Sequence, residues 1–272
     1  MESAKLRILA VGAHPDDCEE CFGGTTTKYM RLGHVVKFVS MTNGNAGHQT
    51  MGRAELAAVR LEETRKVAAL TGVEYEVLNN NDGGLIADLA TRDELIAVIR
   101  RFRPDLLLTH RANDYHTDHR NTALLVQDTS YLLMVPLVCP DVPCLREMPV
   151  IMSFFDDFRK PVEFTADVSV DIDDVMDAKV NMLDCHRSQY YSWLPWVEHE
   201  EAQLPESPED RLSWLGEKTR ARDAAIARKC RARLTDRYGM ARGGAVRYAE
   251  AFETNEYGAP LTEALANKLF PF

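Results

Sequence analysis

The sequence predicts an α/β protein with a doubly wound, mostly parallel β-sheet. Over roughly the first 130 residues, short and nearly continuous apolar runs alternate with longer segments of helical periodicity. Such apolar runs are typical of parallel strands that are covered on both faces, and right-handed crossovers then place helices on both sides of the sheet. The length of 272 residues and a hydrophobic content of 45% fit one large globular domain, with or without an appendage.

Four strands and four helices are expected in this first part. The first strand is the apolar run Leu6–Val11, and Gly23-Gly24-Thr25 is expected to open a helix that runs to about Leu32. Thr71-Gly72 is typical of a helix end. The further strands are expected at 35–41, 74–78 and 106–110, and the further helices from after residue 52 to 71, at 92–102 and at about 119–133.

The remainder of the chain is less regular. We expect strands at 150–154 and 162–168, a helix at 171–185, an acidic linker or flap at 199–210 and a highly charged helix at 211–237. The predicted organisation is therefore a main domain, residues 1–197, with a helical and irregular C-terminal extension, residues 198–272, packed on it.

The charge of the chain excludes some function classes. A formal net charge of −10 argues against general binding to nucleic acids or anionic membranes, which favours basic proteins. No apolar run approaches the ~18 residues of a membrane span, and the N-terminus lacks the pattern of a signal peptide. The six cysteines are scattered rather than arranged as a disulfide framework. We therefore expect a cytoplasmic protein with reduced thiols.

A first chemically dense cluster, His14-Pro15-Asp16-Asp17, directly follows the first expected strand. His14 and Asp17 are both suitable zinc ligands and lie close enough in sequence to fold around one ion. Asp16 lies between them and is free to act as a base. The alternative is that Asp17 caps the following helix and His14 is a hydrogen-bonded residue at the end of the strand.

A second cluster, DYHTDHR from Asp114 to Arg120, follows the expected strand at 106–110. Carboxyl ends of neighbouring parallel strands meet at one edge of the sheet, where ligands bind. One of the two histidines of this second cluster, His116 and His119, can complete a His/Asp/His metal site. The other stays free for acid or oxyanion chemistry. The alternative is a solvated loop in which Thr117 or Asp118 caps a helix.

The two clusters together resemble the motifs of the PIG-L/LmbE-like deacetylases, the N-acetylglucosaminylphosphatidylinositol deacetylase family. AHPDDCEECFGGT resembles the first motif and DYHTDHR the second, and weaker matches involve Arg60 with Glu63 and Lys179 with Ser188-Gln189. The resemblance runs over about residues 6–190. It implies a Rossmann-like parallel sheet and hydrolysis of N-acetyl groups on amino sugars or their conjugates, with one divalent metal, usually zinc.

By position, the resemblance implies that His14, Asp17 and His119 are the metal ligands and that Asp16 is the general base. Three protein ligands with one open position are typical of catalytic zinc. Zinc lowers the pKa of bound water to about 7, so that a nearby carboxylate needs only to receive the proton.

The resemblance also implies that His116 stabilises the oxyanion and protonates the leaving amine, with Asp118 as its orienting partner. The resemblance implies that Arg60 contacts the substrate. We expect Tyr115 to contact the substrate as well. Asn43, in the loop after the second strand, either binds sugar hydroxyls or simply forms a turn, and the sequence leaves this open.

Two other features have competing interpretations. Cys18 and Cys21 form a C-x-x-C at a helix start, which suggests a redox pair, but buried packing is favoured and Cys18 as a metal neighbour stays open. Gly23 and Gly24 match no phosphate-binding motif and indicate close packing of helix on sheet. Four aromatic residues form either a wall for sugar rings or a small core: Tyr190, Tyr191, Trp193 and Trp196.

The sequence thus predicts a zinc-dependent N-deacetylase with one zinc, or another divalent metal, per chain. Its expected partner is a small N-acetylated amino sugar or conjugate, with no nucleic acid and no membrane, and the chain is expected to form a homo-oligomer. Two alternatives stay open: a metal-dependent hydrolase of another amide or ester, and a non-catalytic Rossmann-like module that binds a sugar or nucleotide.

Overall fold

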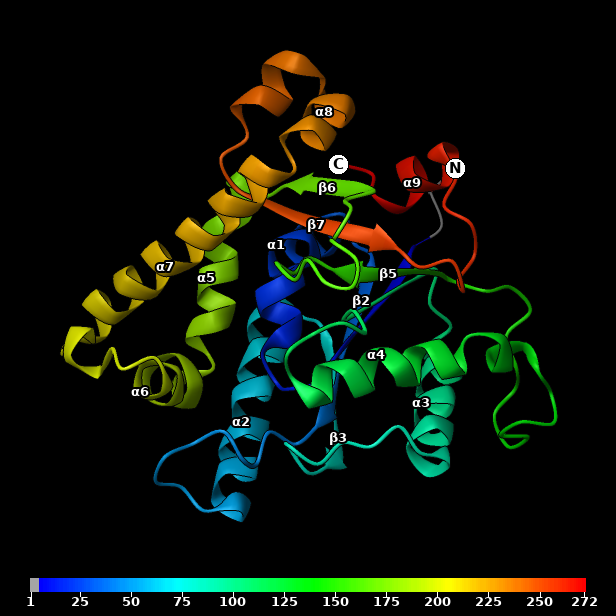
Figure 1. Cartoon of the computed structure of the whole chain (residues 1–272), viewed down its shortest axis with the longest axis horizontal. Helices are drawn as coiled ribbons and strands as arrows, with labels where there is room; N and C mark the ends of the chain where they lie inside the picture. Colours follow the sequence, from blue (N-terminus) through cyan, green and yellow to red (C-terminus); the bar gives the residue numbers. More distant parts are fainter. Residues whose placement is uncertain (1–4) are drawn as a thin grey trace.

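The computed structural model describes residues 5–272, in which seven strands form one mixed sheet with helices on both faces (Figure 1). The strand order is β3-β2-β1-β4-β5-β7-β6. The strands are β1 Arg7–Gly12, β2 Val35–Thr42, β3 Glu74–Asn80, β4 Leu106–Thr109, β5 Val150–Phe154, β6 Val168–Asp171 and β7 Ala249–Thr254. The α-helices are α1 Asp17–Arg31, α2 Arg53–Thr71, α3 Leu89–Phe102, α4 Thr117–Thr129, α5 Met176–Asp184, α6 Leu194–Val197, α7 Pro208–Lys229, α8 Arg231–Ala245 and α9 Glu263–Leu269.

The central strands bury both faces, as their continuous apolar runs predict. In β1, Ile8 and Ala10 join the core under α1, α2, α5 and α7, whereas Leu9 and Val11 join the core under α3 and α4. Alternate side chains of a strand point to opposite faces, so one short run supplies both cores. Strands β1 to β5 pair in parallel, which confirms the expected doubly wound sheet.

Helix α1 begins earlier than the sequence analysis expected. It starts at Asp17, directly after the first cluster, so that Gly23 and Gly24 lie in its middle rather than at its start. A Cβ atom on Gly24 would lie 2.8 Å from Cγ2 of Ile172, and the amide of Gly24 donates to the Glu250 carboxylate at 2.8 Å. Close packing of α1 on the sheet therefore explains this glycine.

Gly24→Ala is expected to lower the free energy of unfolding by about 1–3 kcal/mol, because the added methyl group overpacks the contact with Ile172. Urea unfolding measures the change. Gly244→Ala on α8 is the matched control, since a Cβ atom there meets nothing within 4 Å. Equal stability of the two variants would show that the contact between α1 and Ile172 accommodates the added methyl group without loss of stability.

The C-terminal part contains the largest departures from the expected elements. Residues 198–272 were expected to pack on the main domain, but they also supply β7, which lies between β5 and β6 and pairs antiparallel with both. The expected charged helix is two helices, α7 and α8. No strand was predicted at β7, because antiparallel insertion from a distant segment leaves no local signal.

The strand expected at 162–168 is also shifted, since β6 covers only Val168–Asp171, where it pairs with β7. The preceding residues are held by other contacts. Arg111 donates to the carbonyl oxygen of Val162, and Phe164 packs against Phe155. The helix expected from residue 171 accordingly begins later, as α5 at Met176.

Within residues 5–272, no helix combines the length and apolar character that crossing a membrane requires. The sequence analysis expected no signal peptide at the N-terminus. Residues 1–4 of that segment lie outside the residues that the structure describes.

Candidate active site

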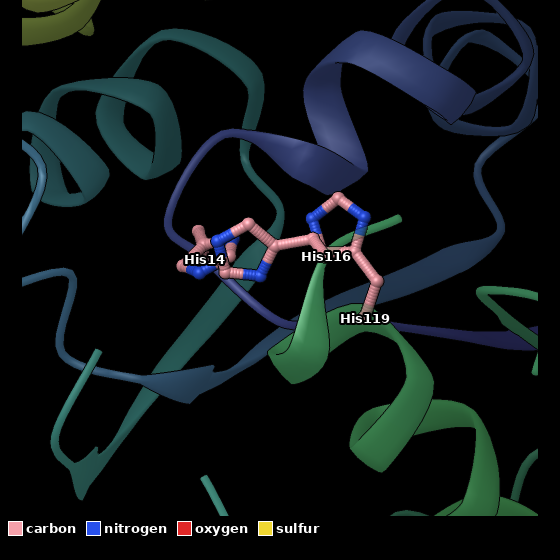
Figure 2. A group of neighbouring side chains, drawn as sticks. All are labelled: His14, His116 and His119. Atoms are coloured by element: carbon pink, nitrogen blue, oxygen red, sulfur yellow. The ribbon is translucent and has the colours of Figure 1, made fainter. Parts of the chain in front are cut away.

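The two sequence clusters meet at the carboxyl ends of β1 and β4. These strands are neighbours, and the chain order reverses between them, which is where doubly wound sheets bind ligands. Figure 2 shows three imidazole rings grouped where the loop after β1 meets the start of α4. The ring centroid of His14 lies 4.6 Å from that of His116 and 5.2 Å from that of His119. The structure therefore brings the predicted site residues of both clusters together.

Asp17 is the hub of this group. Its Oδ2 accepts from the backbone amides of Ala13 at 2.8 Å and His14 at 2.7 Å. The same oxygen lies 3.6 Å from Nδ1 of His14 and 3.1 Å from Nε2 of His110, while Oδ1 lies 3.5 Å from Nε2 of His119. Burial alone would raise the pKa of Asp17, but His119 and His110 hold it well below its usual range. The carboxylate stays ionised among nitrogen donors.

Three groups of ligand atoms here are compact enough for one ion, each with atoms within 4.8 Å of one another. His14, His116 and His119 form the first, Asp17, His110 and His119 form the second, and His14, Asp82 and Asp118 form the third. The first two groups contain His119, and Asp17 contacts His14 and His119. Nitrogen and carboxylate donors in this number fit zinc or another divalent ion, so the residues present suit the expected metal.

The outward-facing nitrogens of two candidate ligands point at carboxylates. Nδ1 of His119 lies 2.9 Å from Oδ2 of Asp114, and Nε2 of His14 lies 3.3 Å from Oδ1 of Asp82 and 3.4 Å from Oδ2 of Asp118. Metal-binding histidines usually carry such partners, which fix the ring and raise its basicity. Burial favours a higher pKa for Asp82, but the neighbouring His14 ring lowers it to about 2.

Asp114→Asn is expected to weaken metal affinity by about 10–100-fold, because the carboxylate that orients His119 loses its charge. Competition with a chelating dye measures the affinity. Unchanged affinity would mean that Asp114 does not support a metal ligand.

Asp16 lies at the wall of the cavity, immediately before α1. Its backbone φ of 156° is unusual for a residue other than glycine, and the side chain of Arg60 donates to the carbonyl oxygen of the preceding Pro15. The Arg60 Nη2 atom lies 3.1 Å from Oδ2 of Asp16. Burial raises the pKa of Asp16 to about 6, against the opposing charge of Arg60. Such a carboxyl can both take up and release a proton near neutral pH.

His116 occupies the N-cap position of α4. Its Nδ1 accepts from the backbone amide of Asp118 at 3.1 Å, which leaves the proton of the neutral ring on Nε2. Burial lowers the pKa of His116, and nearby His14 and His119 lower it further. The carboxylate of Asp118 accepts from the amides of Gly83 and Leu85 and faces His14, so the contact of Asp118 with His116 is made through its backbone amide.

The three expected substrate contacts lie in different settings. Tyr115 is 74% exposed and lines the cavity. Arg60 also lines it but is only 2% exposed and is paired with the carboxylate of Asp16. Asn43 is not a lining residue: its side chain donates to Asn79, which favours the turn interpretation.

Sequence reasoning missed three residues of the site: His110, Asp82 and Asp114. His110 ended the expected fourth strand and Asp114 opened the second motif, so both were placed near the site without a role. The ring of His110 stacks on that of His119, with centroids 4.0 Å apart. Asp82 follows β3 and accepts from the amides of the loop after β2. Its only sequence signal was its position after a strand.

The cysteines and aromatic residues divide between core and cavity. Cys18 is buried, Cys21 is partly buried, both thiols are free, and burial raises the pKa of each, which favours packing over redox chemistry. Tyr190 and Tyr191 are also buried. Trp193 stacks on Trp196 with centroids 5.3 Å apart and lines the cavity. The cavity has a volume of about 980 Å³ and extends from the histidines to α7.

The comparison of sequences identifies related enzymes. The profile of the GlcNAc-PI de-N-acetylase family, PIG-L, matches residues 9–130. The diacetylchitobiose deacetylase of Thermococcus kodakarensis is 31% identical over 201 residues, which cover 70% of this chain and 73% of the relative. The 4-oxalmesaconate hydratase of Pseudomonas putida is 25% identical over 201 residues, with 71% and 78% coverage.

Solved structures share the fold. The N,N'-diacetylchitobiose deacetylase of Pyrococcus horikoshii, in complex with an inhibitor, superposes with a TM-score of 0.71 at 24% identity, covering 92% of this chain and 84% of the other. The 4-carboxy-2-hydroxymuconate hydratase of Pseudomonas putida gives a TM-score of 0.73 at 22% identity, with 95% and 99% coverage. Proteins with different named activities are therefore built on this fold.

Proposed function

This chain belongs to the PIG-L (LmbE-like) family of deacetylases, and on that premise we propose that it removes an N-acetyl group from an amino sugar or amino-sugar conjugate. The observation that carries the proposal is the convergence of Asp16, Asp17 and the histidines at one cavity. This set combines a metal-binding hub, a base of raised pKa and a neutral imidazole with its proton on Nε2.

We propose one zinc ion per chain, held by His14, Asp17 and His119, although the same donors also suit other divalent metals. When bound, the ion supplies Lewis-acid polarisation of the amide carbonyl and a water of lowered pKa. The donor set supports this assignment because a second ring nitrogen of each histidine faces a carboxylate: Nε2 of His14 faces Asp82, and Nδ1 of His119 faces Asp114.

The proposed roles of the chain's own residues follow from their positions. Asp16 takes the proton of the attacking water, and Arg60 holds its carboxylate in place. The Nε2–H of His116 donates to the oxygen on which negative charge develops, and the proton that Asp16 took from the water then passes to the leaving nitrogen. Since the backbone amide of Asp118 fixes the ring through Nδ1, we assign Asp118 a positioning role through its main chain.

A hydratase activity is the second candidate, because a curated relative and a solved structure, both from Pseudomonas putida, are named as hydratases. The charges of the cavity disfavour it. A carboxylate-rich substrate needs unpaired cations, but Arg60 faces Asp16, Arg111 is paired with two carboxylates and Arg222 is paired with Glu20. A neutral N-acetylated sugar has no such requirement.

A panel of N-acetylated sugars tests the proposal, with free amine as the readout. We expect release of amine and acetate from at least one sugar, and no hydration of unsaturated polycarboxylic acids. Hydration without deacetylation would overturn the proposal. Cleavage of simple esters or other amides, with all N-acetylated sugars inert, would replace it with the broader hydrolase function.

Two further expectations stay predictions. The homo-oligomer can be tested by light scattering of the full chain. The absence of nucleic-acid and membrane partners is expected from the net charge of −10.

A further inference from the structure

A buried carboxylate, that of Glu63, lies next to the arginine that contacts the proposed base. Glu63 follows Arg60 by three residues on α2, and its side chain is only 4% exposed. Its Oε2 lies 3.9 Å from Nε of Arg60. A buried charge is unfavourable unless it is paired and hydrogen-bonded, so the position of Glu63 has to be explained by the groups that it contacts.

A second set of contacts fixes this carboxylate. Oε1 of Glu63 accepts from the backbone amide of Ser188 at 2.7 Å, and Oε2 accepts from the Ser188 hydroxyl at 2.8 Å. Ser188 directly precedes the π-helical turn Gln189–Trp193. The side chain of Gln189 donates to the carbonyl oxygen of Gly47 at 3.1 Å, and both residues line the cavity. Glu63 is thus anchored to a segment of the cavity wall.

The guanidinium of Arg60 is held at two edges. Its Nη2 donates to the carbonyl oxygen of Pro15 and lies 3.1 Å from Oδ2 of Asp16. Its Nε is buried, has no hydrogen-bond partner within residues 5–272 and faces Glu63. Because a guanidinium is planar and rigid, a negative charge at the Nε edge fixes the direction in which the Nη2 edge points. Glu63 thereby favours the orientation that places Nη2 at Asp16.

The loop after β2 encloses the same guanidinium. A Cβ atom on Gly44 would lie 3.3 Å from Nε of Arg60 and 3.0 Å from Cδ of Pro15. The φ of Gly44 is 64°, a conformation that glycine adopts without a steric penalty. The backbone can therefore approach Arg60 closely, and the orientation of the guanidinium depends on its protein neighbours rather than on solvent.

Asp16 depends on support from outside its own segment. Its φ of 156° is unusual, and its side chain makes no capping hydrogen bond to α1. Strained backbone conformations persist only where the surrounding structure holds them. Arg60 contacts this segment at Pro15 and at the Asp16 carboxylate, so a rotation of the guanidinium would displace the base. A misplacement of about 1 Å can lower a rate by about 100-fold.

A purely structural role for Glu63 is the alternative, because its carboxylate ties α2 to Ser188. The two roles make different demands on the side chain. An uncharged acceptor such as glutamine can still bond to Ser188, whereas a carboxylate is needed to compensate the charge of Arg60. Replacement of Glu63 by glutamine therefore separates the two roles.

We propose that Glu63 is a positioning residue for the reaction: it orients the Arg60 guanidinium, which in turn holds the Asp16 carboxylate where it takes the proton of the attacking water. The inference rests on the proposed deacetylase function. Glu63 does not line the cavity, so it acts through Arg60 and not through contact with the substrate.

The test compares Glu63→Gln with the wild-type protein on the β-1,4-linked disaccharide of N-acetylglucosamine, with free amine as the readout. We expect kcat to fall about tenfold and KM to change less than about twofold, because a misplaced base slows the chemical step without weakening binding. The metal content, measured by elemental analysis, should stay that of the wild-type protein. Glu62→Gln is the matched control: it removes the neighbouring carboxylate of α2, which is 55% exposed and pairs with Arg65, and should leave both constants unchanged.

A double variant tests whether Glu63 acts through Arg60. In the Arg60→Gln background, Glu63→Gln should lower kcat by less than about twofold further, since the group that it orients is already absent. The double variant removes both buried charges, so it provides the comparison even if Glu63→Gln alone, with an uncompensated cation, does not fold. A larger further loss would mean that Glu63 acts independently of Arg60 and would overturn the proposal.

Unchanged kcat in Glu63→Gln, or a rise in KM alone, would also overturn it. Crystal structures separate this result from failure of the proposed function. If the wild-type protein releases amine from no sugar, the deacetylase is refuted, but loss of the contact between Arg60 and Asp16 in Glu63→Gln would retain the positioning role. The same 3.1 Å contact in both structures would refute the positioning role whatever the turnover.

Discussion

Replacing Asp16 with Asn is expected to lower kcat by about 10²–10⁴-fold, the usual contribution of a general base. Asn keeps the size of the side chain and can still bond to Arg60, but it cannot accept a proton. Because Asp16 is not a proposed metal ligand, the metal content should stay that of the wild-type protein. Steady-state deacetylation and elemental analysis of the same sample measure both quantities.

Asp128→Asn is the control for this variant, because Asp128 is an exposed carboxylate on α4 that does not line the cavity. It should retain full activity. If Asp16→Asn also retained full activity, Asp16 would not be the base. If it lost its metal, Asp16 would belong to the metal site instead.

Removal of His119 is expected to weaken metal affinity by more than about 100-fold, beyond the effect typical of an outer carboxylate partner. Two of the three compact ligand groups within the described residues 5–272 contain His119, and the third, His14 with Asp82 and Asp118, offers only one nitrogen donor. Titration of chelator-treated His119→Ala with zinc, followed by calorimetry, measures the affinity. His199→Ala, which removes an exposed imidazole, is the control and should bind like the wild-type protein.

The same titration distinguishes the proposed ligand set from the group Asp17, His110 and His119. If His14, Asp17 and His119 hold the ion, His14→Ala should lose metal as His119→Ala does, whereas His110→Ala should have a smaller effect. If His110→Ala loses metal and His14→Ala does not, His110 replaces His14 in the ligand set. Wild-type affinity in His119→Ala would contradict both of these sets.

Local patterns predicted the parallel half of the fold because each element there carries its own signal. The β1 run alternates between two cores, and Gly72 ends α2 in the left-handed conformation that Thr71-Gly72 predicts. The start of α1 was placed too late, because the chemically dense segment before Gly23 looked like a loop. Its acidic residues instead occupy the first turn of the helix, where the dipole favours them.

The clusters of the candidate site were predictable because both follow strands whose carboxyl ends must meet. The distances between their side chains were not, since they depend on how the loops close. His110 and Asp82 gained contacts with the site only through the tertiary arrangement. Asp118 turned toward His14 because the amides of Gly83 and Leu85 bind its carboxylate. Likewise, β7 lies almost 100 residues after β5 in the sequence, and no local sequence pattern indicates that the two strands pair.

The central proposal for this protein is metal-dependent release of amine from an N-acetylated sugar. The measurement is deacetylation of the N-acetylglucosamine disaccharide by chelator-treated protein as zinc is added back in steps. We expect no activity without metal and a rise in activity that saturates near one zinc ion per chain. Undiminished activity in protein that elemental analysis shows to be free of metal would contradict it.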